Sequence, residues 1–476
     1  MARRFPGDGY ADVLIGLQHG DEGKGRFVDG LADLYDIFVR YNGGANAGHT
    51  VVVHGKSLAL HQIPSGVHQL NKKLFIASQC VVNLEKLCAE IDEVEKAGLP
   101  VLGRLRISSQ ASVIQPGHII QDQITMGAVG TTGNGIGAAY AAQALRMNLD
   151  RRLDIRLGDL LHDTERSFEM IKQNLEADIQ QYGIPGFDVE GTMNRLRQCF
   201  ERVRGCIDTD PLYLIKEIRG GMRILLEGAQ AFGLDKTSGV TPDVTSSNTG
   251  VQAAFLSAGI PVEFKRYAYG VAKLIPSRVG HGPFVSEFGG GRSERHCMED
   301  AGKRHTRDVE SQLFGNRIHE LLQSDDPLEV GIALRMIGGE YGASTGRPRR
   351  IGMLDLMQLK FAIALNGIDG IFLTKADQLV HFSKTRPNLI PTVYSYSMNG
   401  ERIASMPTTK SALQLATPNV RYYPSFPQDI SLIRDPGDLP NELRNVLAEV
   451  EDSVEARILA VGVGPGRDQV VHLSSL

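Results

Sequence analysis

The stretch Gly20-Asp21-Glu22-Gly23-Lys24-Gly25 follows the apolar run Val13-Leu14-Ile15 and decides how the amino-terminal part of the chain folds. A buried strand that enters a glycine-rich turn ending in lysine is typical of phosphate binding in α/β folds, because backbone N–H groups and the next helix face the anion. The turn is not a Walker A loop, since Gln18 and Gly25 replace the required glycine and hydroxyl residue. Asp21 would repel phosphate unless it binds a metal ion or moves a proton. The alternative is an ordinary glycine-rich connection.

Other apolar runs predict further buried strands. They lie at residues 12–17, 36–41, 222–227, 370–374 and 457–463. Their β-branched content and glycine boundaries are typical of parallel strands covered on both faces. Residues 160–205 show helical spacing instead, with Thr164 as the expected N-cap and Gly183 as the expected end of the first helix. The pattern predicts an α/β fold with a large, mostly parallel central sheet, a P-loop-like phosphate site and helical subdomains.

Composition and charge narrow the function. The chain has 476 residues, 42% of them hydrophobic and 22% charged, which is ordinary for a globular protein. A net charge of −4 argues against a nucleic-acid partner. Five scattered cysteines without zinc spacing indicate a reducing compartment. No run approaches eighteen apolar residues, and residues 1–8 lack the apolar core of a signal peptide, so we expect a cytoplasmic protein without a membrane span.

Several further motifs follow in order along the chain. They are Tyr41-Asn42-Gly43-Gly44-Ala45-Asn46-Ala47-Gly48-His49-Thr50, Val129-Gly130-Thr131-Thr132-Gly133-Asn134-Gly135-Ile136-Gly137, Leu226-Glu227-Gly228-Ala229-Gln230, Val244-Thr245-Ser246-Ser247-Asn248, Gly342-Ala343-Ser344-Thr345-Gly346-Arg347-Pro348-Arg349-Arg350, Thr374-Lys375-Ala376-Asp377 and Gly462-Val463-Gly464-Pro465. Together with the first turn, this series closely resembles the adenylosuccinate synthetase family, from about residue 13 to residue 470. The resemblance implies a GTP-dependent ligase of purine nucleotide biosynthesis that joins IMP and L-aspartate.

The resemblance also implies how the chain is organised. The family fold is one large domain, so we expect residues 1–476 to form a single domain with a helical subdomain at 160–205. The family leads us to expect a shorter connection near residues 289–338, which we therefore interpret as an insertion containing a helix at 307–323.

The chemistry implied by the family assigns the catalytic groups. A purine 6-oxo group leaves poorly, and phosphorylation of O6 to give 6-phosphoryl-IMP turns it into a good leaving group. This step needs a base for the N1 proton and a donor that stabilises the transferring phosphoryl group. By resemblance, Asp21 is the base and His49 the donor. Mg²⁺ is the expected cofactor, with Asp21 and Gly48 as its protein ligands.

The resemblance assigns binding residues to each substrate. GTP would contact Gly20, Asp21, Glu22, Gly23, Lys24, Gly25, Arg26, Gly48, His49, Thr50, Arg349, Lys375, Ala376, Asp377, Gly462, Val463 and Gly464. IMP would contact Asp21, Glu22, Gly23, Lys24, Asn46, Ala47, Gly48, His49, Thr132, Arg146, Gln230, Thr245 and Arg347. The amino-acid substrate would contact Ala343, Ser344, Thr345, Gly346, Arg347, Pro348 and Arg349. Arg146 matches an arginine donated across a subunit boundary, which implies a homodimer.

One departure from the family pattern leaves the amine substrate open. Asn134 stands where the family has an arginine that contributes to the aspartate site, and a neutral amide cannot form the same bidentate contact. Milder departures occur at His19, Arg26, Ala45, Ala138 and Ser344. An alternative is a paralogue that uses the same phosphoryl activation with another amine or another 6-oxopurine nucleotide. A more remote alternative is an inactive nucleotide-binding protein, against which Asp21, Lys24, His49 and Asp377 together argue.

Overall fold

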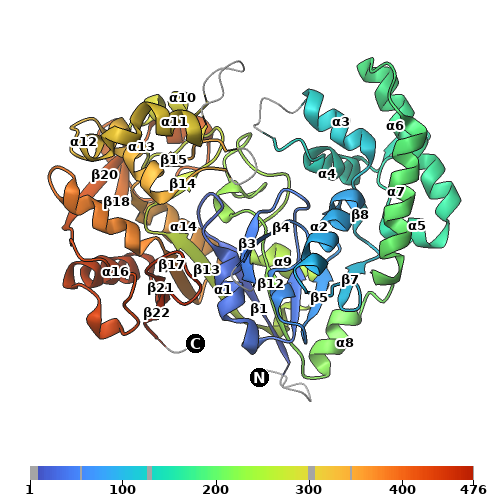
Figure 1. The fold of residues 1–476 in the computed structure, drawn as a ribbon, viewed down its shortest axis with the longest axis horizontal. Coiled ribbons are helices and arrows are strands. Elements are labelled where there is room, and N and C mark those ends of the chain that lie inside the picture. Colours follow the sequence, from blue (N-terminus) through green and yellow to red (C-terminus); the bar gives the residue numbers. More distant parts are fainter. Residues whose placement is uncertain (1–8, 54–55, 126–130, 299–305, 343–345, 475–476) are drawn as a thin grey trace. The chain divides into compact units, whose positions relative to one another are not determined.

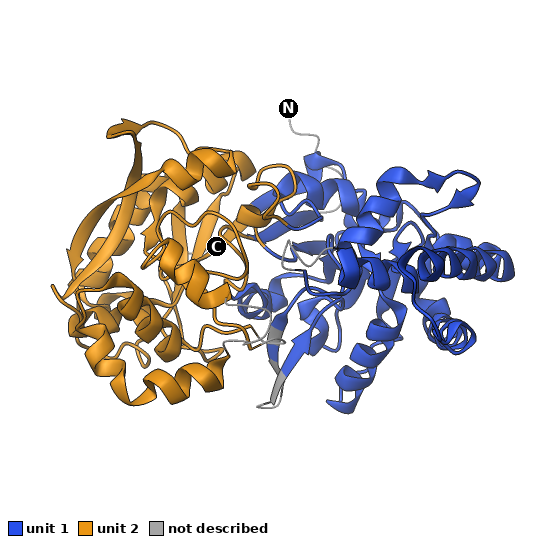
Figure 2. Ribbon diagram, turned by 90° about the horizontal axis from the view of Figure 1, so that it is seen from above, with its two compact units in different colours: residues 1–15, 23–230, 245–267 blue, residues 16–22, 231–244, 268–476 orange. Residues whose placement is uncertain are grey.

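The computed structural model describes residues 9–53, 56–125, 131–298, 306–342 and 346–474. The chain divides into two compact units, coloured separately in Figure 2. Unit 1 comprises residues 1–15, 23–230 and 245–267, and unit 2 comprises residues 16–22, 231–244 and 268–476. Both units therefore draw on distant parts of the sequence, and the chain passes between them inside the glycine-rich turn.

Figure 1 labels the elements of unit 1 where there is room. Its strands are β1 (Tyr10–Gly16, whose last residue belongs to unit 2), β2 (Ile37–Arg40), β3 (His49–Val53), β4 (Lys56–Leu60), β5 (Lys73–Ile76), β6 (Val81–Val82), β7 (Leu105–Ser108), β8 (Ser112–Val113), β9 (Met147–Asn148), β10 (Arg151–Arg152), β11 (Ile207–Asp208) and β12 (Arg223–Glu227). Its helices are α1 (Lys24–Gly30), α2 (Leu84–Lys96), α3 (Pro116–Thr125), α4 (Ile136–Leu145), α5 (Leu157–His162), α6 (Thr164–Tyr182), α7 (Val189–Val203), α8 (Tyr213–Arg219) and α9 (Val251–Ala258).

Unit 2 contains the rest of the elements (Figure 1). Its strands are β13 (Lys265–Lys273, which begins in unit 1), β14 (Ser277–Arg278), β15 (Arg350–Ile351), β16 (Leu354–Asp355), β17 (Gly370–Thr374), β18 (Leu389–Met398), β19 (Glu401–Ile403), β20 (Thr417–Pro424), β21 (Arg457–Gly462) and β22 (Val470–His472). Its helices are α10 (Gly291–Met298), α11 (Arg307–Phe314), α12 (Ile318–Leu322), α13 (Pro327–Gly338), α14 (Leu356–Asn366), α15 (Lys410–Leu415) and α16 (Asn441–Val454).

The main sheet has ten strands and is mostly parallel. In unit 1 the spatial order is β11-β7-β5-β2-β12-β1, and every neighbouring pair is parallel. In unit 2 the order is β13-β17-β21-β22, and only the β21–β22 pair is antiparallel. Strands β2 and β17 are buried along their whole length, as parallel strands covered on both faces require. The predicted α/β class and all five predicted strands are confirmed, with bounds shifted by at most two residues.

Two local predictions need correction. The N-cap of α6 is Asp163 and not Thr164, because the Asp163 carboxylate accepts a hydrogen bond from the Arg166 amide. The same helix ends at Gly183 in the left-handed conformation, as predicted. The helix expected at 307–323 is broken into α11 and α12 by a 3₁₀ turn at Gly315–Arg317, where glycine and asparagine are weak helix formers. The helical subdomain at 160–205 and the insertion at 289–338 stay predictions.

Candidate active site

The glycine-rich turn lies between β1 and α1 (Figure 1). Gly20 and Gly23 have φ angles of 97° and 91°, which glycine adopts at no steric cost. Asp21 has φ 56°, an uncommon value for a residue with a side chain. The buried Glu22 carboxylate accepts a hydrogen bond from the Gly20 amide at 2.7 Å. The Glu22 carboxylate thus fixes the turn from inside, whereas the Asp21 side chain is 40% exposed.

Within unit 2, the Asp21 carboxylate is paired with an arginine from a distant motif. Arg349 Nη2 lies 2.6 Å from Asp21 Oδ2, and Arg349 Nη1 lies 2.9 Å from Glu340 Oε2. Arg349 itself is largely buried. Although burial acts in the opposite direction, the carboxylates of Asp21 and Glu340 raise the pKa of Arg349, so it stays charged. The structure therefore brings together Asp21 and Arg349, two residues that the sequence predicts to contact the nucleotide.

Within unit 1, His49 is the first residue of β3 and lies in a buried polar cluster. Its Nδ1 contacts a carboxylate oxygen of Glu227, the last residue of β12, at hydrogen-bonding distance. Glu227 also accepts hydrogen bonds from the Ser65 amide, at 2.8 Å, and from the Ser65 hydroxyl. Arg40 Nη1, at the end of β2, lies 3.1 Å from His49 Nδ1 and 3.5 Å from Glu227. The cluster holds the imidazole ring of His49 in one orientation.

The pKa values of His49 and Glu227 in this cluster are both shifted from their usual values. Burial, together with the Arg40 charge, lowers the pKa of His49 to about 4, although Glu227 acts in the opposite direction. Burial alone would raise the pKa of Glu227, but Arg40, His49 and Ser65 lower it well below its usual range. Glu227 is therefore ionised, and His49 is neutral at neutral pH. With Nδ1–H donating to Glu227, the neutral ring leaves Nε2 as an acceptor, and Nε2 lies 3.4 Å from Arg40 Nη1.

The partners of His49 were not predicted from the sequence. Glu227 was part of a recognised motif, but only Gln230 in that motif was assigned a role, and neither Arg40 nor Ser65 was named. The available signal was a charged residue at the end of an otherwise apolar buried strand, which β2 and β12 both show. A buried charge in such a place needs a partner.

Other predicted IMP contacts lie in unit 1. Lys24 is buried, and its Nζ donates to the Gln230 carbonyl at 2.5 Å. Both side-chain amide atoms of Gln230 are buried without a hydrogen-bond partner among the described residues, and Gln230 has φ 56°. A Cβ added to Gly43 would lie 3.1 Å from Gln230 Oε1. Unpaired buried polar atoms are costly, so the Gln230 amide is suited to a polar ligand.

The remaining assigned residues of unit 1 lie in helix α1, in β3 or in loops. Asn46 Oδ1 accepts from the Gly44 amide at 3.2 Å, and Gly48 is exposed. The sites of Gly25, Arg26, Ala47, Thr132 and Thr245 are described, whereas the side chain of Thr50 lies outside the described residues, as do Ala343, Ser344 and Thr345. The IMP and amino-acid assignments therefore stay predictions.

Asn134 and Arg146 flank α4. The Asn134 side chain contacts Lys86 Nζ, and its Nδ2 donates to the Ala45 carbonyl at 3.3 Å. Arg146 caps the end of α4 with φ 64° and is exposed. Leu145 and Leu149 beside it are 63% and 94% exposed. Exposed apolar side chains around an arginine are suited to a protein interface.

The predicted guanine-binding residues follow two neighbouring parallel strands of unit 2. Lys375 comes directly after β17 with φ 66°, and Ala376 and Asp377 begin the next 3₁₀ turn. Asp377 Oδ2 accepts from Gln378 Nε2 at 2.6 Å. Gly462 is the last residue of β21 and Val463 and Gly464 follow it, and a Cβ on Gly464 would lie 2.5 Å from the Gln469 side chain. Because β17 and β21 are parallel, both groups lie at the carboxyl edge, where α/β sheets bind ligands.

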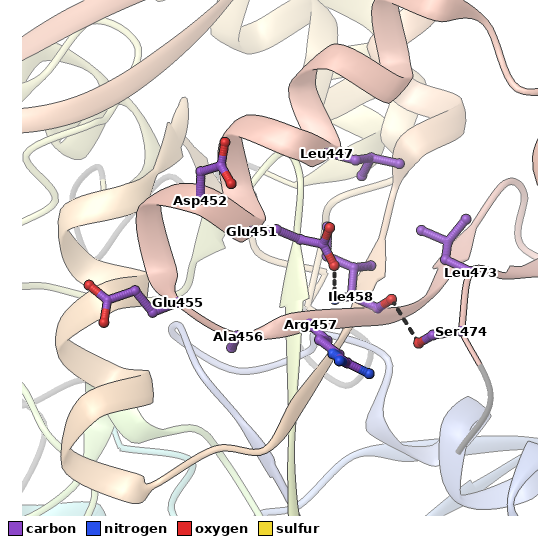
Figure 3. A pocket seen from close by; sticks show the side chains of 9 residues that line it. All are labelled: Leu447, Glu451, Asp452, Glu455, Ala456, Arg457, Ile458, Leu473 and Ser474. Carbon is purple, nitrogen blue, oxygen red and sulfur yellow. Dashed lines mark hydrogen bonds between the residues drawn. The ribbon is translucent and has the colours of Figure 1, made fainter.

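A cavity of about 440 Å³ lies elsewhere in unit 2 (Figure 3). It is lined by Leu447, Glu451, Asp452, Glu455, Ala456, Arg457, Ile458, Leu473 and Ser474. Its polar groups are partly used locally, since Glu451 accepts from the Ile458 amide at 2.6 Å. Arg457 is the first residue of β21, so the cavity lies at the amino end of that strand. It is therefore at the opposite edge from the predicted guanine residues and contains none of the predicted site residues.

Among the described residues, no three His, Cys, Asp or Glu side chains are grouped as a protein-only metal site would need. Mg²⁺ is commonly held by one or two carboxylates together with substrate phosphates and water, so the partly exposed Asp21 fits such an ion. No helix in the described ranges is long and apolar enough to cross a membrane.

The sheet, the glycine-rich turn and the residues at the strand ends define an α/β enzyme that acts on nucleotide phosphates. The family model described as adenylosuccinate synthetase matches residues 13–471. The chain belongs to the adenylosuccinate synthetase family, whose members are ligases of purine biosynthesis that couple GTP to the joining of IMP and aspartate.

Individual relatives agree. The chain is 39% identical to adenylosuccinate synthetase 2 of Cupriavidus pinatubonensis over 97% of both chains. It is 36% identical to the adenylosuccinate synthetase of Bifidobacterium adolescentis over 98% of this chain and 99% of the relative. It is also similar to the solved structure of the fully ligated enzyme from Plasmodium falciparum, with a TM-score of 0.83 and 29% identity, covering 98% of this chain and 100% of that one.

Proposed function

We propose that this ligase makes adenylosuccinate through 6-phosphoryl-IMP, with Asp21 as the base that removes the N1 proton of IMP and His49 as the donor to the transferring phosphoryl group. The observation that carries the proposal is Asp21 itself. It is a carboxylate in a left-handed, glycine-flanked turn, exposed on one side and held by Arg349 on the other. A carboxylate is out of place in a phosphate site unless it handles a proton or a metal ion.

Asp21 and His49 would each handle a proton, and different residues hold them in place. O6 of IMP would attack the γ-phosphorus of GTP while Asp21 takes the N1 proton, and the bond from the γ-phosphorus to the β–γ bridging oxygen breaks to release GDP. The amine of aspartate would then displace phosphate from C6. Glu227 supports His49 by accepting from Nδ1. Nε2 donates to the phosphoryl group only when the ring carries a second proton, which the Glu227 carboxylate and the charge of a bound phosphate favour. General acid–base groups of this kind contribute about 10²–10⁴-fold to a rate.

Mg²⁺ would be held by the Asp21 carboxylate and the Gly48 carbonyl. When bound, it neutralises phosphate charge during transfer. Asp21 would have to exchange its contact with Arg349 for the ion, and a 40% exposed side chain can do so without unfolding a core.

The remaining assignments complete the proposal. GTP specificity rests on Asp377, because a carboxylate accepts two N–H bonds from guanine that adenine does not offer. Arg146 would reach the IMP phosphate of a second subunit in a cytoplasmic homodimer, and the exposed leucines beside it support that role. We also propose that residues 1–476 act as one catalytic domain, with 160–205 as a helical subdomain and 289–338 as an insertion.

A second candidate has one observation in its favour. Asn134 replaces an expected arginine, and its amide is engaged with Lys86 and the Ala45 carbonyl. A paralogue that accepts an uncharged amine would tolerate this loss of charge.

An amine panel with IMP, GTP and Mg²⁺, followed by mass spectrometry of the product, separates the two candidates. We expect aspartate to be the substrate but to bind weakly, because one charge-assisted bond is worth about 1.5–3 kcal/mol. Asn134→Arg should lower the KM for aspartate several-fold and leave those for GTP and IMP unchanged. A wild type that ignores aspartate and accepts a neutral amine would establish the paralogue instead.

A further inference from the structure

Glu340 is a buried carboxylate of unit 2 that is not among the predicted site residues. It follows α13 and its left-handed cap Gly339, and only 5% of its surface is exposed. Its backbone amide donates to the Arg335 carbonyl at 3.0 Å, so the helix end fixes where the side chain starts. A fixed starting point limits the positions that its carboxylate can reach.

The two oxygens of Glu340 hold different groups. Oε2 accepts from Arg349 Nη1 at 2.9 Å, from Lys273 Nζ at 2.9 Å and from Ser277 Oγ at 2.8 Å. Oε1 lies 3.0 Å from Lys375 Nζ. One carboxylate therefore joins three cations that come from β13, from the end of β17 and from the segment before β15.

The charge balance keeps this arrangement intact. Burial alone would favour the protonated carboxyl group, but Lys273, Lys375 and Arg349 together hold the pKa of Glu340 well below its usual range. Burial lowers the pKa of Lys273, against the attraction of Glu340. Lys375 is further fixed because its Nζ donates to the Gly338 carbonyl at 3.0 Å. Glu340 thereby holds the side chains of Lys375 and Arg349 in single positions. Free lysine and arginine side chains adopt many conformations, and fixing them has an entropic cost.

The two ends of this network have separate functional assignments. Arg349 contacts Asp21, the proposed base, at the phosphate end of the nucleotide. Lys375 directly precedes Ala376 and Asp377 at the guanine end. We propose that Glu340 is a positioning residue that couples the guanine end of the GTP site to its phosphate end, by holding Lys375 on one oxygen and Arg349 on the other. This inference rests on the proposed function, since it uses the GTP assignments of both cations.

A simpler reading is that Glu340 only neutralises the buried Lys273. The two readings differ in one consequence. If Glu340 couples the two ends, loss of Arg349 also loosens Lys375, so the two single substitutions share part of their effect. If it only balances Lys273, the effects of Arg349 and Lys375 on nucleotide binding are independent and multiply.

The test is a double-mutant cycle read by equilibrium binding of GDP with Mg²⁺. The cycle compares Arg349→Met, Lys375→Met and their combination. It is repeated in a Lys273→Met/Glu340→Gln background, which removes both members of the buried pair and so avoids an uncompensated buried charge. Asp12→Asn is the matched control, because Asp12 is a fully buried carboxylate paired with Arg266 at 2.5 Å, at the amino end of β1.

We expect the combined loss of GDP affinity to be at least threefold smaller than the product of the single losses. In the Lys273→Met/Glu340→Gln background the losses should multiply, and GDP affinity there should already be about tenfold weaker. Asp12→Asn should change GDP affinity by less than twofold. Should that background fail to fold, the cycle in the wild-type background decides alone.

Multiplicative losses in the wild type would overturn the coupling and leave the proposed function standing. A wild type that binds no GDP would overturn the proposed function itself, and with it this inference. The two failures are therefore distinguishable in one data set.

Discussion

In each unit a predicted catalytic residue belongs to a cluster of charged side chains around one buried carboxylate, Glu227 in unit 1 and Glu340 in unit 2. The two clusters differ in how much of their side chains is exposed. In unit 1, His49, Arg40 and Glu227 are all at most 6% exposed, so the histidine is enclosed and its partners are fixed. In unit 2, exposure rises from Lys273, at 1%, through Arg349 to Asp21, at 40%. His49 is therefore held in a fixed position in unit 1, whereas Asp21, the proposed base in unit 2, lies where substrate and metal can displace Arg349.

The largest expected effect tests whether both clusters are catalytic. Asp21→Ala and His49→Ala should each reduce turnover by about 10² or more, because each removes a proton-handling group. Asp21→Ala should leave thermal stability unchanged, since its side chain is partly exposed, while His49→Ala should lower it. Steady-state rates and melting temperatures check both. A variant that keeps more than a tenth of wild-type turnover would remove its residue from the mechanism.

The contributions of the two clusters to the free energy of unfolding should be lost in different pH ranges. The pKa of His49 in the folded chain is about 4, below its unfolded value of 6.5. Between these two pH values the unfolded chain binds a proton at His49 and the folded chain does not. The contribution of His49, on the order of 3 kcal/mol, is therefore present above pH ~6.5 and lost as the pH falls towards 4. The pKa of Glu340 is also lowered, from 4.5, so its contribution persists above that value and is lost only in more acidic solution.

Chemical denaturation of wild type and His49→Gln between pH 7.5 and 4.5 measures this difference. We expect the unfolding free energy of the wild type to fall more steeply, because glutamine at position 49 takes up no proton while every other titrating group is common to the two proteins. Parallel curves for the two proteins would show that His49 is not buried as described.

A smaller effect should distinguish the units by nucleotide choice. Asp377→Asn should reduce the preference for GTP over ATP by about tenfold, because the carboxylate loses its second acceptor and an unpaired buried group costs about 1–3 kcal/mol. His49→Ala should lower the rate with either nucleotide and leave the preference unchanged. Competition between GTP and ATP in the ligase assay measures both. Equal use of GTP and ATP by the wild type would exclude Asp377 as the guanine reader.

The strands were predicted well because each is marked by residues that are close together in the sequence. The strand expected at 370–374 has those bounds in β17, since an apolar run between glycine and a polar turn is sufficient to define it. The broken helix after Arg307 was missed because a two-residue weak point in a helical pattern is a weak signal. The site was predicted only in part. Asp21 and His49 stand in recognisable motifs, whereas Glu227 is 178 residues from His49 in sequence. Only the folded chain shows such a pairing.

The most direct test of the account follows the oxygen at C6. IMP labelled with ¹⁸O at this position is incubated with GTP, aspartate and Mg²⁺, and the inorganic phosphate released is analysed by mass spectrometry. If O6 attacks the γ-phosphorus and then leaves with it, every molecule of adenylosuccinate formed should be matched by one phosphate carrying ¹⁸O, and Asp21→Ala should form neither. Unlabelled phosphate formed together with adenylosuccinate would contradict activation through 6-phosphoryl-IMP.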